Sequence, residues 1–177
     1  LRLATDAPVA AGPVLFERLD WRPYGIRPVL PIAATAPPGE PTRLDPFRAS
    51  VAEKLRPRLA FADDDAQLGE ALDRWELSLF QDDPFRSEQL KHALDAALGD
   101  GQGSWAAAMR GGALLGETAE ERANLVERFE APTSDLVRRL LVAVLMHGNR
   151  ARLLRELDGA LLGLRAGRER VAELRAS

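Results

Sequence analysis

The distribution of proline constrains this 177-residue chain more than any other feature of its sequence. Nine of its 12 prolines fall within the first 46 residues, at positions 8, 13, 23, 28, 31, 37, 38, 41 and 46. Proline fixes φ and removes a backbone donor, so a continuous helix cannot form at this density. We therefore predict a proline-rich extended arm over residues 1–45 and a separate helical domain over residues 46–177.

Two parts of the arm have the composition of short strands. Aromatic and β-branched residues stand on either side of RPYG, in PVLFERLDW (13–21) and GIRPVLPIA (25–33). This pattern is typical of a β-hairpin, in which Pro28 and Pro31 would require an edge position. The following ATAPPGEPT (34–42) predicts an extended linker.

From residue 46 onward the apolar residues recur with a helical period. The tetrapeptide DPFR occurs at residues 45–48 and 83–86. In both copies Asp suits the N-cap, Pro the first helical position, and Phe the start of the buried face. The apolar residues that follow at four-residue spacing are Val51, Leu55 and Leu59 after the first copy, and Leu90, Leu94 and Leu98 after the second. The alternative fold is an array of helical hairpins repeating every 38 or 39 residues, for which a third matching unit is missing.

Capping signals mark the remaining helices. Thr118 and Glu121 form a capping-box pattern, Thr133 or Ser134 can cap the next helix, and Gly148 followed by Asn149 separates the last two. The segment 136–148 is apolar on nearly every side, so we predict that it lies at the centre of the domain. The fold class expected is mainly α, a multi-helix bundle of about seven helices preceded by the arm. These helices begin near residues 46, 66, 85, 104, 118, 134 and 150, and the last is predicted to run to near the C-terminus.

The pentapeptide GALLG occurs twice, at residues 112–116 and 159–163. Glycine inside a helix costs about 0.5–1 kcal/mol relative to alanine, so its retention indicates close approach of another backbone. We predict that the two GALLG segments lie in closely packed helices, one against the other. Gly159, Gly163 and Gly167 recur every four residues and would form one stripe, which we predict as a partner-binding surface.

A leucine stripe runs beside these glycines in the last predicted helix. Its members, spaced by three and four, are Leu154, Leu157, Leu161, Leu164 and Val171. Such a seam packs either on its own domain or on a partner, including a second copy of the chain. We assign Leu157, Leu161 and Leu164 to the same predicted partner-binding surface.

Charge is unevenly divided along the chain. The net charge is −3, but residues 138–177 carry +5 and the first 137 residues carry −8. A basic surface can bind nucleic acid or an acidic partner. No aromatic residue is interleaved with these arginines, as a platform for stacking single strands would require. The residues that would serve the nucleic-acid alternative are Arg150, Arg152, Arg165, Arg168 and Arg170.

Signatures of catalysis and metal binding are weak in this sequence. Its two histidines, His92 and His147, belong to no zinc pattern, and His147 is expected to contact the last carbonyls of a buried helix. Asp63–Asp65 lacks the spacing of a calcium loop and is expected to cap a helix. GDGQGSW (99–105) follows a helix rather than a strand, so it does not fit a dinucleotide fingerprint. We predict no metal and no cofactor, and the sequence favours a protein that is not an enzyme.

The sequence as a whole favours a protein that functions by interaction with other molecules. The chain has no cysteine, no apolar run of membrane-spanning length and no signal-peptide core, which favours a cytoplasmic protein away from membranes. We expect a non-enzymatic protein-interaction or regulatory helical module that is part of a larger assembly. Its partner would be another protein or a second copy. The alternative is a nucleic-acid-associated protein that uses the basic C-terminal helix.

Overall fold

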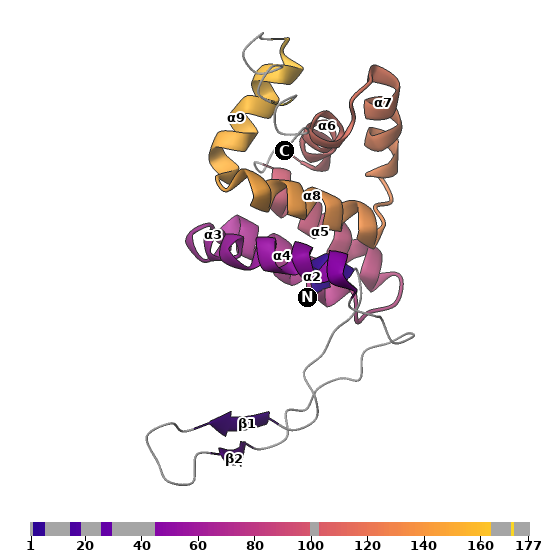
Figure 1. The fold of residues 1–177 in the computed structure, drawn as a ribbon. Helices are drawn as coiled ribbons and strands as arrows, with labels where there is room; N and C mark the ends of the chain where they lie inside the picture. Colours follow the sequence, from indigo (N-terminus) through magenta and orange to yellow (C-terminus); the bar gives the residue numbers. More distant parts are fainter. Residues whose placement is uncertain are drawn as a thin grey trace.

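The computed structural model shows a mainly helical protein, as predicted (Figure 1). It describes residues 2–5, 45–99, 103–163 and 171, and the backbone alone of residues 15–18 and 26–29. Within 45–99 and 103–163 the helices are α2 (Pro46–Leu55), α3 (Ala60–Asp64), α4 (Ala66–Ser78), α5 (Phe85–Leu98), α6 (Ser104–Leu115), α7 (Ala119–Arg128), α8 (Ser134–His147) and α9 (Arg150–Leu161), with a 3₁₀ turn, η1 (Arg56–Arg58), between the first two. No helix in these ranges is long and apolar enough to cross a membrane.

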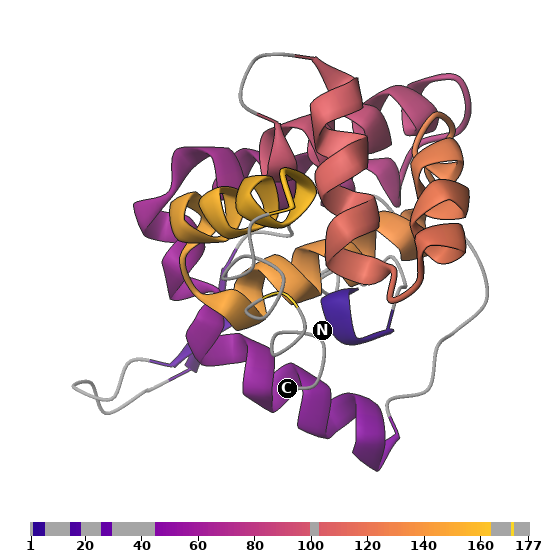
Figure 2. The ribbon, with the colours of Figure 1, turned by 90° about the horizontal axis from the view of Figure 1, so that it is seen from above.

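Helix α8 lies at the centre of the domain, as its apolar sequence predicts. It contacts α2, α4, α5, α6 and α9. In Figure 1 the helices α2 and α4 lie on one side of α8, and α6, α7 and α9 lie on the other. Figure 2 shows these last three helices from above, arranged over α8. The buried residues of α8 are Leu136, Val137, Leu140, Leu141, Val144 and Leu145.

The predicted caps of the later helices are confirmed. Thr118 and Glu121 form a capping box at the start of α7, where Glu121 N donates to Thr118 Oγ1 at 3.1 Å. Thr133 caps α8, and Gly148 ends it in the left-handed region with φ 76°. Asn149 then caps α9. Each of these contacts joins residues within four positions of each other, so local sequence determines them.

The two DPFR segments begin their helices differently. Asp45 caps α2 by accepting from the backbone N–H of Arg48 at 2.8 Å, and Pro46 takes the first helical position, as predicted. In the second copy Pro84 is itself the N-cap residue, and its bond to Asp83 is cis. The prediction that Asp83 caps this helix is wrong.

Neither DPFR phenylalanine starts a buried face, which corrects a further prediction. Phe47 is 77% exposed and Phe85 is 62% exposed. Along α2 only Leu55, at the far end, is buried, so this helix enters the core at its last turn. In α5 the buried stripe contains Leu90, Leu94 and Leu98. Phe85 lies five residues before Leu90, and at 100° per residue that places it on another face.

Pro57 divides the first predicted helix. The regular spacing of Val51, Leu55 and Leu59 predicts one continuous helix, but α2 ends at Leu55 and is followed by η1 and α3. Proline has no N–H to donate, and its ring clashes with the carbonyl four residues earlier, here that of Glu53. Leu59, which follows η1, is 40% exposed.

The range predicted as an arm contains three described segments. Residues 2–5 form a short helix, α1 (Arg2–Thr5), rather than extended chain, and Leu3 is buried. Strands β1 (Leu15–Arg18) and β2 (Ile26–Val29) pair antiparallel, with Leu15 opposite Val29. The turn between the strands and the predicted linker 34–42 lie outside the described residues, so the hairpin as a whole stays a prediction.

Candidate partner-binding surfaces

The first GALLG segment allows two helices to approach closely. A Cβ added at Gly112 would lie 3.0 Å from the carbonyl oxygen of Arg122 and 3.0 Å from Cγ2 of Val126. At Gly116 it would lie 2.9 Å from the backbone nitrogen of Arg122. The predicted reason for these glycines is confirmed, and α6 does pack against α9 as predicted, but the atoms that face Gly112 and Gly116 belong to α7. Because only three residues connect α6 to α7, the two helices pack side by side.

The second GALLG segment ends a helix. Helix α9 stops at Leu161, Leu162 is its C-cap, and Gly163 has φ 79° in the left-handed region that favours glycine. The prediction that this helix continues without a break to near the C-terminus is wrong, because α9 ends at Leu161 and the φ of Gly163 is not helical. Gly159 lies inside α9, so Gly159 and Gly163 do not share a helical stripe. The predicted site residues that lie outside the described part of the chain are Leu164, Arg165, Gly167, Arg168 and Arg170.

The leucine seam divides between the core and the surface. Leu157 is fully buried, Leu154 packs against the core, and Val171 belongs to the same cluster. At the end of α9, Leu161 is 41% exposed and Leu162 is 79% exposed. We call these two residues the α9 leucine pair. Leu157 therefore stabilises its own domain, whereas Leu161 is partly exposed, and the helix-periodic stripe did not include Leu162.

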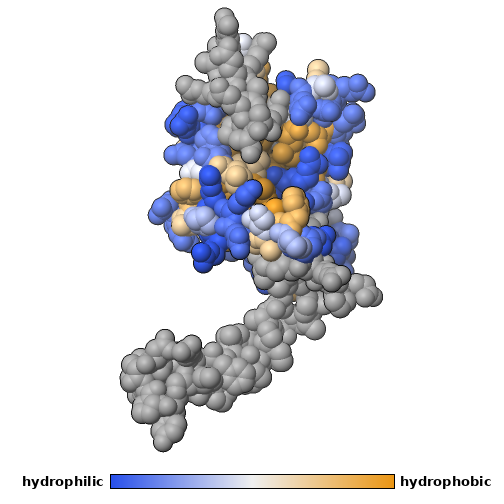
Figure 3. Space-filling view, in the orientation of Figure 1, coloured by the Kyte–Doolittle hydropathy of each residue, from blue (hydrophilic) through white to orange (hydrophobic). Residues whose placement is uncertain are grey.

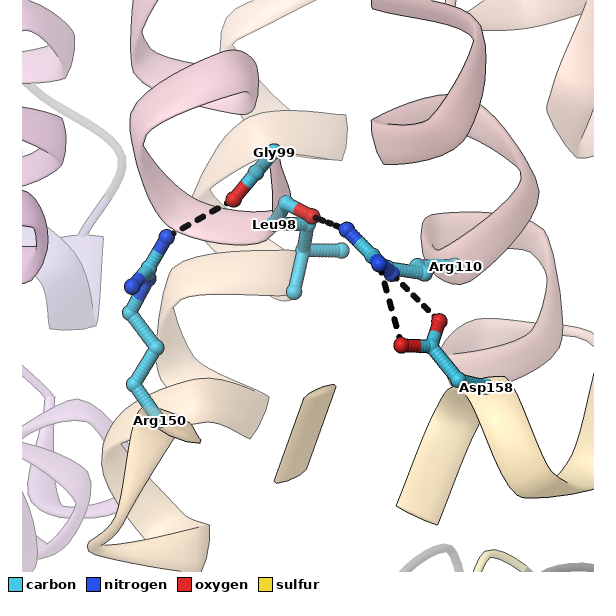
Figure 4. Close-up of polar contacts among 5 residues, drawn as sticks. All are labelled: Leu98, Gly99, Arg110, Arg150 and Asp158. Carbon is cyan, nitrogen blue, oxygen red and sulfur yellow. Dashed lines mark hydrogen bonds and ion pairs between the residues drawn. The ribbon is translucent and has the colours of Figure 1, made fainter. Parts of the chain in front are cut away.

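A buried arginine fixes α9 against α6 (Figure 4). The guanidinium of Arg110 binds the carboxylate of Asp158 through two hydrogen bonds, Nε to Oδ1 at 2.7 Å and Nη2 to Oδ2 at 3.0 Å. Its Nη1 donates to the carbonyl of Leu98 at 2.8 Å. The side chain of Arg110 is only 7% exposed, so this two-point pair sits largely away from water. Sequence reasoning missed Arg110, although a single charge inside SWAAAMRGGALLG was a signal for it.

Arg150 holds the same helix end from α9. Its Nε donates to the carbonyl of Ala97 at 2.8 Å, and its Nη2 to that of Gly99 at 2.9 Å. These carbonyls end α5, where the helix dipole favours a cation. Figure 4 shows Arg110 and Arg150 approaching this helix end from different elements. The nucleic-acid reading assigned Arg150 to a binding surface, but its described contacts are internal.

A buried carboxylate joins the end of α8 to α9. The side chains of His147 and Glu156 are each 6% exposed, and His147 Nε2 lies 3.2 Å from Glu156 Oε2. Arg152 Nε donates to the other carboxylate oxygen at 2.8 Å. Burial raises the pKa of Glu156, but the hydrogen bonds and charges of Arg152 and His147 lower it more, so its pKa lies below the ordinary value. His147 thus meets Glu156 instead of the helix carbonyls that we predicted.

The described carboxylates and imidazoles form no metal site. Within the described ranges no three His, Cys, Asp or Glu side chains gather in a way that could hold an ion. Asp65 caps α4, accepting from the N–H groups of Gln67 and Leu68 at 3.1 Å each, as predicted for the aspartate triplet. Asp65 therefore has a local structural role.

A groove opens between α1, α2 and α4. It has a volume of about 300 Å³. We call it the α1 groove. Figure 3 shows that polar residues cover much of one face of the domain, with apolar residues gathered in patches between them. The groove is lined by the apolar residues Leu3, Ala4, Ala52, Leu55, Leu59 and Leu72, and by the charged residues Arg2, Glu53, Arg56 and Glu76.

Comparison with known proteins supplies no function for the chain. No protein-family model, no curated protein and no solved structure matches it. The functional inference therefore rests on the residues and contacts described above.

Proposed function

We propose that this protein is a non-enzymatic helical interaction module, part of a larger assembly, and that a protein partner contacts it at the α9 leucine pair. The observation that carries this proposal is the exposure of Leu161 and Leu162, 41% and 79%, at the end of a helix whose earlier leucines are buried. Two adjacent exposed leucines form a small apolar surface, and its removal from water favours binding of a partner.

The support beneath the leucine pair favours binding. Helix α9 is capped by Asn149, tied to α5 by Arg150 and tied to α6 by Asp158. A surface held by such contacts loses little conformational freedom when a partner binds. The leucine pair is thus presented in a fixed position.

The size of the pair indicates what kind of complex it can support. Full burial of an exposed leucine contributes about 1.5–3 kcal/mol. Leu161 is already more than half buried, so the two residues together offer on the order of 3 kcal/mol before the cost of association. This is too little for a stable complex on its own. The pair therefore acts as one anchor among several contacts, which is why we place the protein in a larger assembly.

Sedimentation velocity over a range of concentrations tests the proposal. The wild type is compared with Leu162→Asp and with Ala119→Asp, a control at an exposed position in the first turn of α7. In parallel, each tagged protein is used for affinity capture from a lysate of the organism that encodes it. We expect self-association or a captured protein that Leu162→Asp loses and Ala119→Asp retains.

Two results would count against the proposal. One is a wild type that stays monomeric and captures the same proteins as Leu162→Asp. The other is binding of labelled DNA or RNA that weakens steeply with salt, since this would favour the nucleic-acid alternative.

A further inference from the structure

Helix α1 is held on the domain as a ligand would be. A helix of four residues has no stability of its own, so its contacts must hold it in place. Leu3 is 6% exposed and Ala4 is 9% exposed, and α1 packs against α2. The apolar part of α1 is therefore its anchor.

Polar contacts on either side of Leu3 fix the direction of α1. The guanidinium of Arg2 pairs with the carboxylate of Glu76 in α4 and lies 5.1 Å from the centroid of the Phe80 ring. An arginine in this position gains both from the charge and from the aromatic face. From α8, Arg138 Nη1 donates to the carbonyl of Leu3 at 3.2 Å. Three helices thus recognise one arginine, one leucine and one backbone carbonyl.

Helix α1 does not fill the α1 groove. Leu3 and Ala4 line an open volume of about 300 Å³. It is at the small end of the range for ligand pockets, and it has room for a large apolar side chain. Its lining includes the apolar residues Leu55, Leu59 and Leu72. A segment with a larger side chain in the place of Ala4 would bury more apolar surface than α1 does.

We propose that a short helical segment of a partner protein binds in the place of α1, on α2, α4 and α8, and extends an apolar side chain into the open volume of the α1 groove. The partner segment carries an arginine and a leucine where α1 has Arg2 and Leu3, followed by a large apolar residue in the place of Ala4. Glu76 and Phe80 select the arginine, and the open volume selects the added apolar side chain. This surface is separate from the α9 leucine pair, so this proposal does not depend on the function proposed for that pair.

A single introduced thiol measures the displacement of α1, because the chain has no cysteine. Ala4→Cys places the thiol in α1, and Ala119→Cys provides an exposed control. The probe is the acetylated peptide LRLLTDAP, which is residues 1–8 with leucine in the fourth position. We expect Ala4→Cys to react slowly with a soluble disulfide reagent, and millimolar peptide to raise that rate at least tenfold. The rate of Ala119→Cys should not change, and a peptide with glutamate in place of its arginine should have no effect.

A second measurement keeps the proposal open to refutation if Ala4→Cys disturbs the docking of α1. Leu3→Asp should release α1, so the fluorescein-labelled peptide should bind this variant at least tenfold more tightly than the wild type. Adding Glu76→Arg should remove that binding. Equal affinity for Leu3→Asp and wild type would overturn the proposal. So would a thiol of Ala4→Cys that reacts slowly without peptide and just as slowly with millimolar peptide.

Discussion

Replacing Gly111 by alanine should destabilise the domain, although alanine is the better helix residue. A Cβ at this position would lie 2.5 Å from Cε2 and 2.7 Å from Cζ of Phe129, and 3.3 Å from Cδ1 of Leu140. Phe129 is 3% exposed, so its ring cannot turn out into water. Overpacking of this severity costs about 3 kcal/mol, at the upper end of the usual range, while alanine gains about 1 kcal/mol in helix propensity. The expected net loss is about 2 kcal/mol, which lowers Tm by roughly 4–8 °C for a chain of this size.

Urea unfolding and calorimetry measure this loss, with Gly69→Ala as the matched control. Gly69 also lies inside a helix, but its added Cβ would meet only the carbonyl oxygen of Ala62 at 3.3 Å. We expect Gly69→Ala to be as stable as the wild type or slightly more so. Phe129→Leu introduced together with Gly111→Ala should recover at least about 1 kcal/mol through coupling between neighbours. A Gly111→Ala variant that gains stability like the control would refute the packing argument.

Three further perturbations probe the polar contacts. Arg110→Met should lower the unfolding free energy by about 2 kcal/mol, less than for a fully buried pair because Asp158 is 43% exposed; a loss near zero in urea unfolding would contradict the role of this pair. Since the pKa of Glu156 is lowered in the fold, its stabilisation is present above the ordinary value of 4.5 and is lost as the pH falls below it. As the pH is lowered below 4.5, the free energy of unfolding should therefore fall less steeply for Glu156→Gln than for the wild type. Parallel curves for the two proteins would exclude the effect. Thr118→Ala should cost about 1 kcal/mol, seen as faster hydrogen exchange in the first turn of α7.

The boundaries of the later helices could be predicted because they depend on neighbours in sequence. Thr118 reaches a backbone donor three residues away, Gly148 supplies a left-handed conformation at its own position, and Asn149 caps the residues that follow it. None of these needs information about distant parts of the chain. The central position of α8 was also predictable, because a helix that is apolar all round must be covered on all sides.

The sequence could not show which helix each glycine faces or which charged residues meet. Gly112 is retained for α7 and Gly163 for a helix end, yet both stand in the same pentapeptide. Arg110 and Asp158 are 48 positions apart and meet only after α5, α6 and α9 have packed. Pro57 lies within the first predicted helix, and its presence in the sequence argued against a continuous helix. The regular spacing of the apolar residues around it nevertheless led to the prediction of one helix.

The carbonyl end of α5 also sets how the domain opens. Arg150 and Arg110 bring donors from two other helices to Ala97, Leu98 and Gly99. If α9 detaches, Arg150 leaves this end and Arg110 loses its carboxylate in the same event. We therefore expect α5, α6 and α9 to open as one cooperative unit, with similar free energies of amide exchange. A partner bound at the end of α9 would then slow exchange in α5, more than sixty residues earlier in the chain.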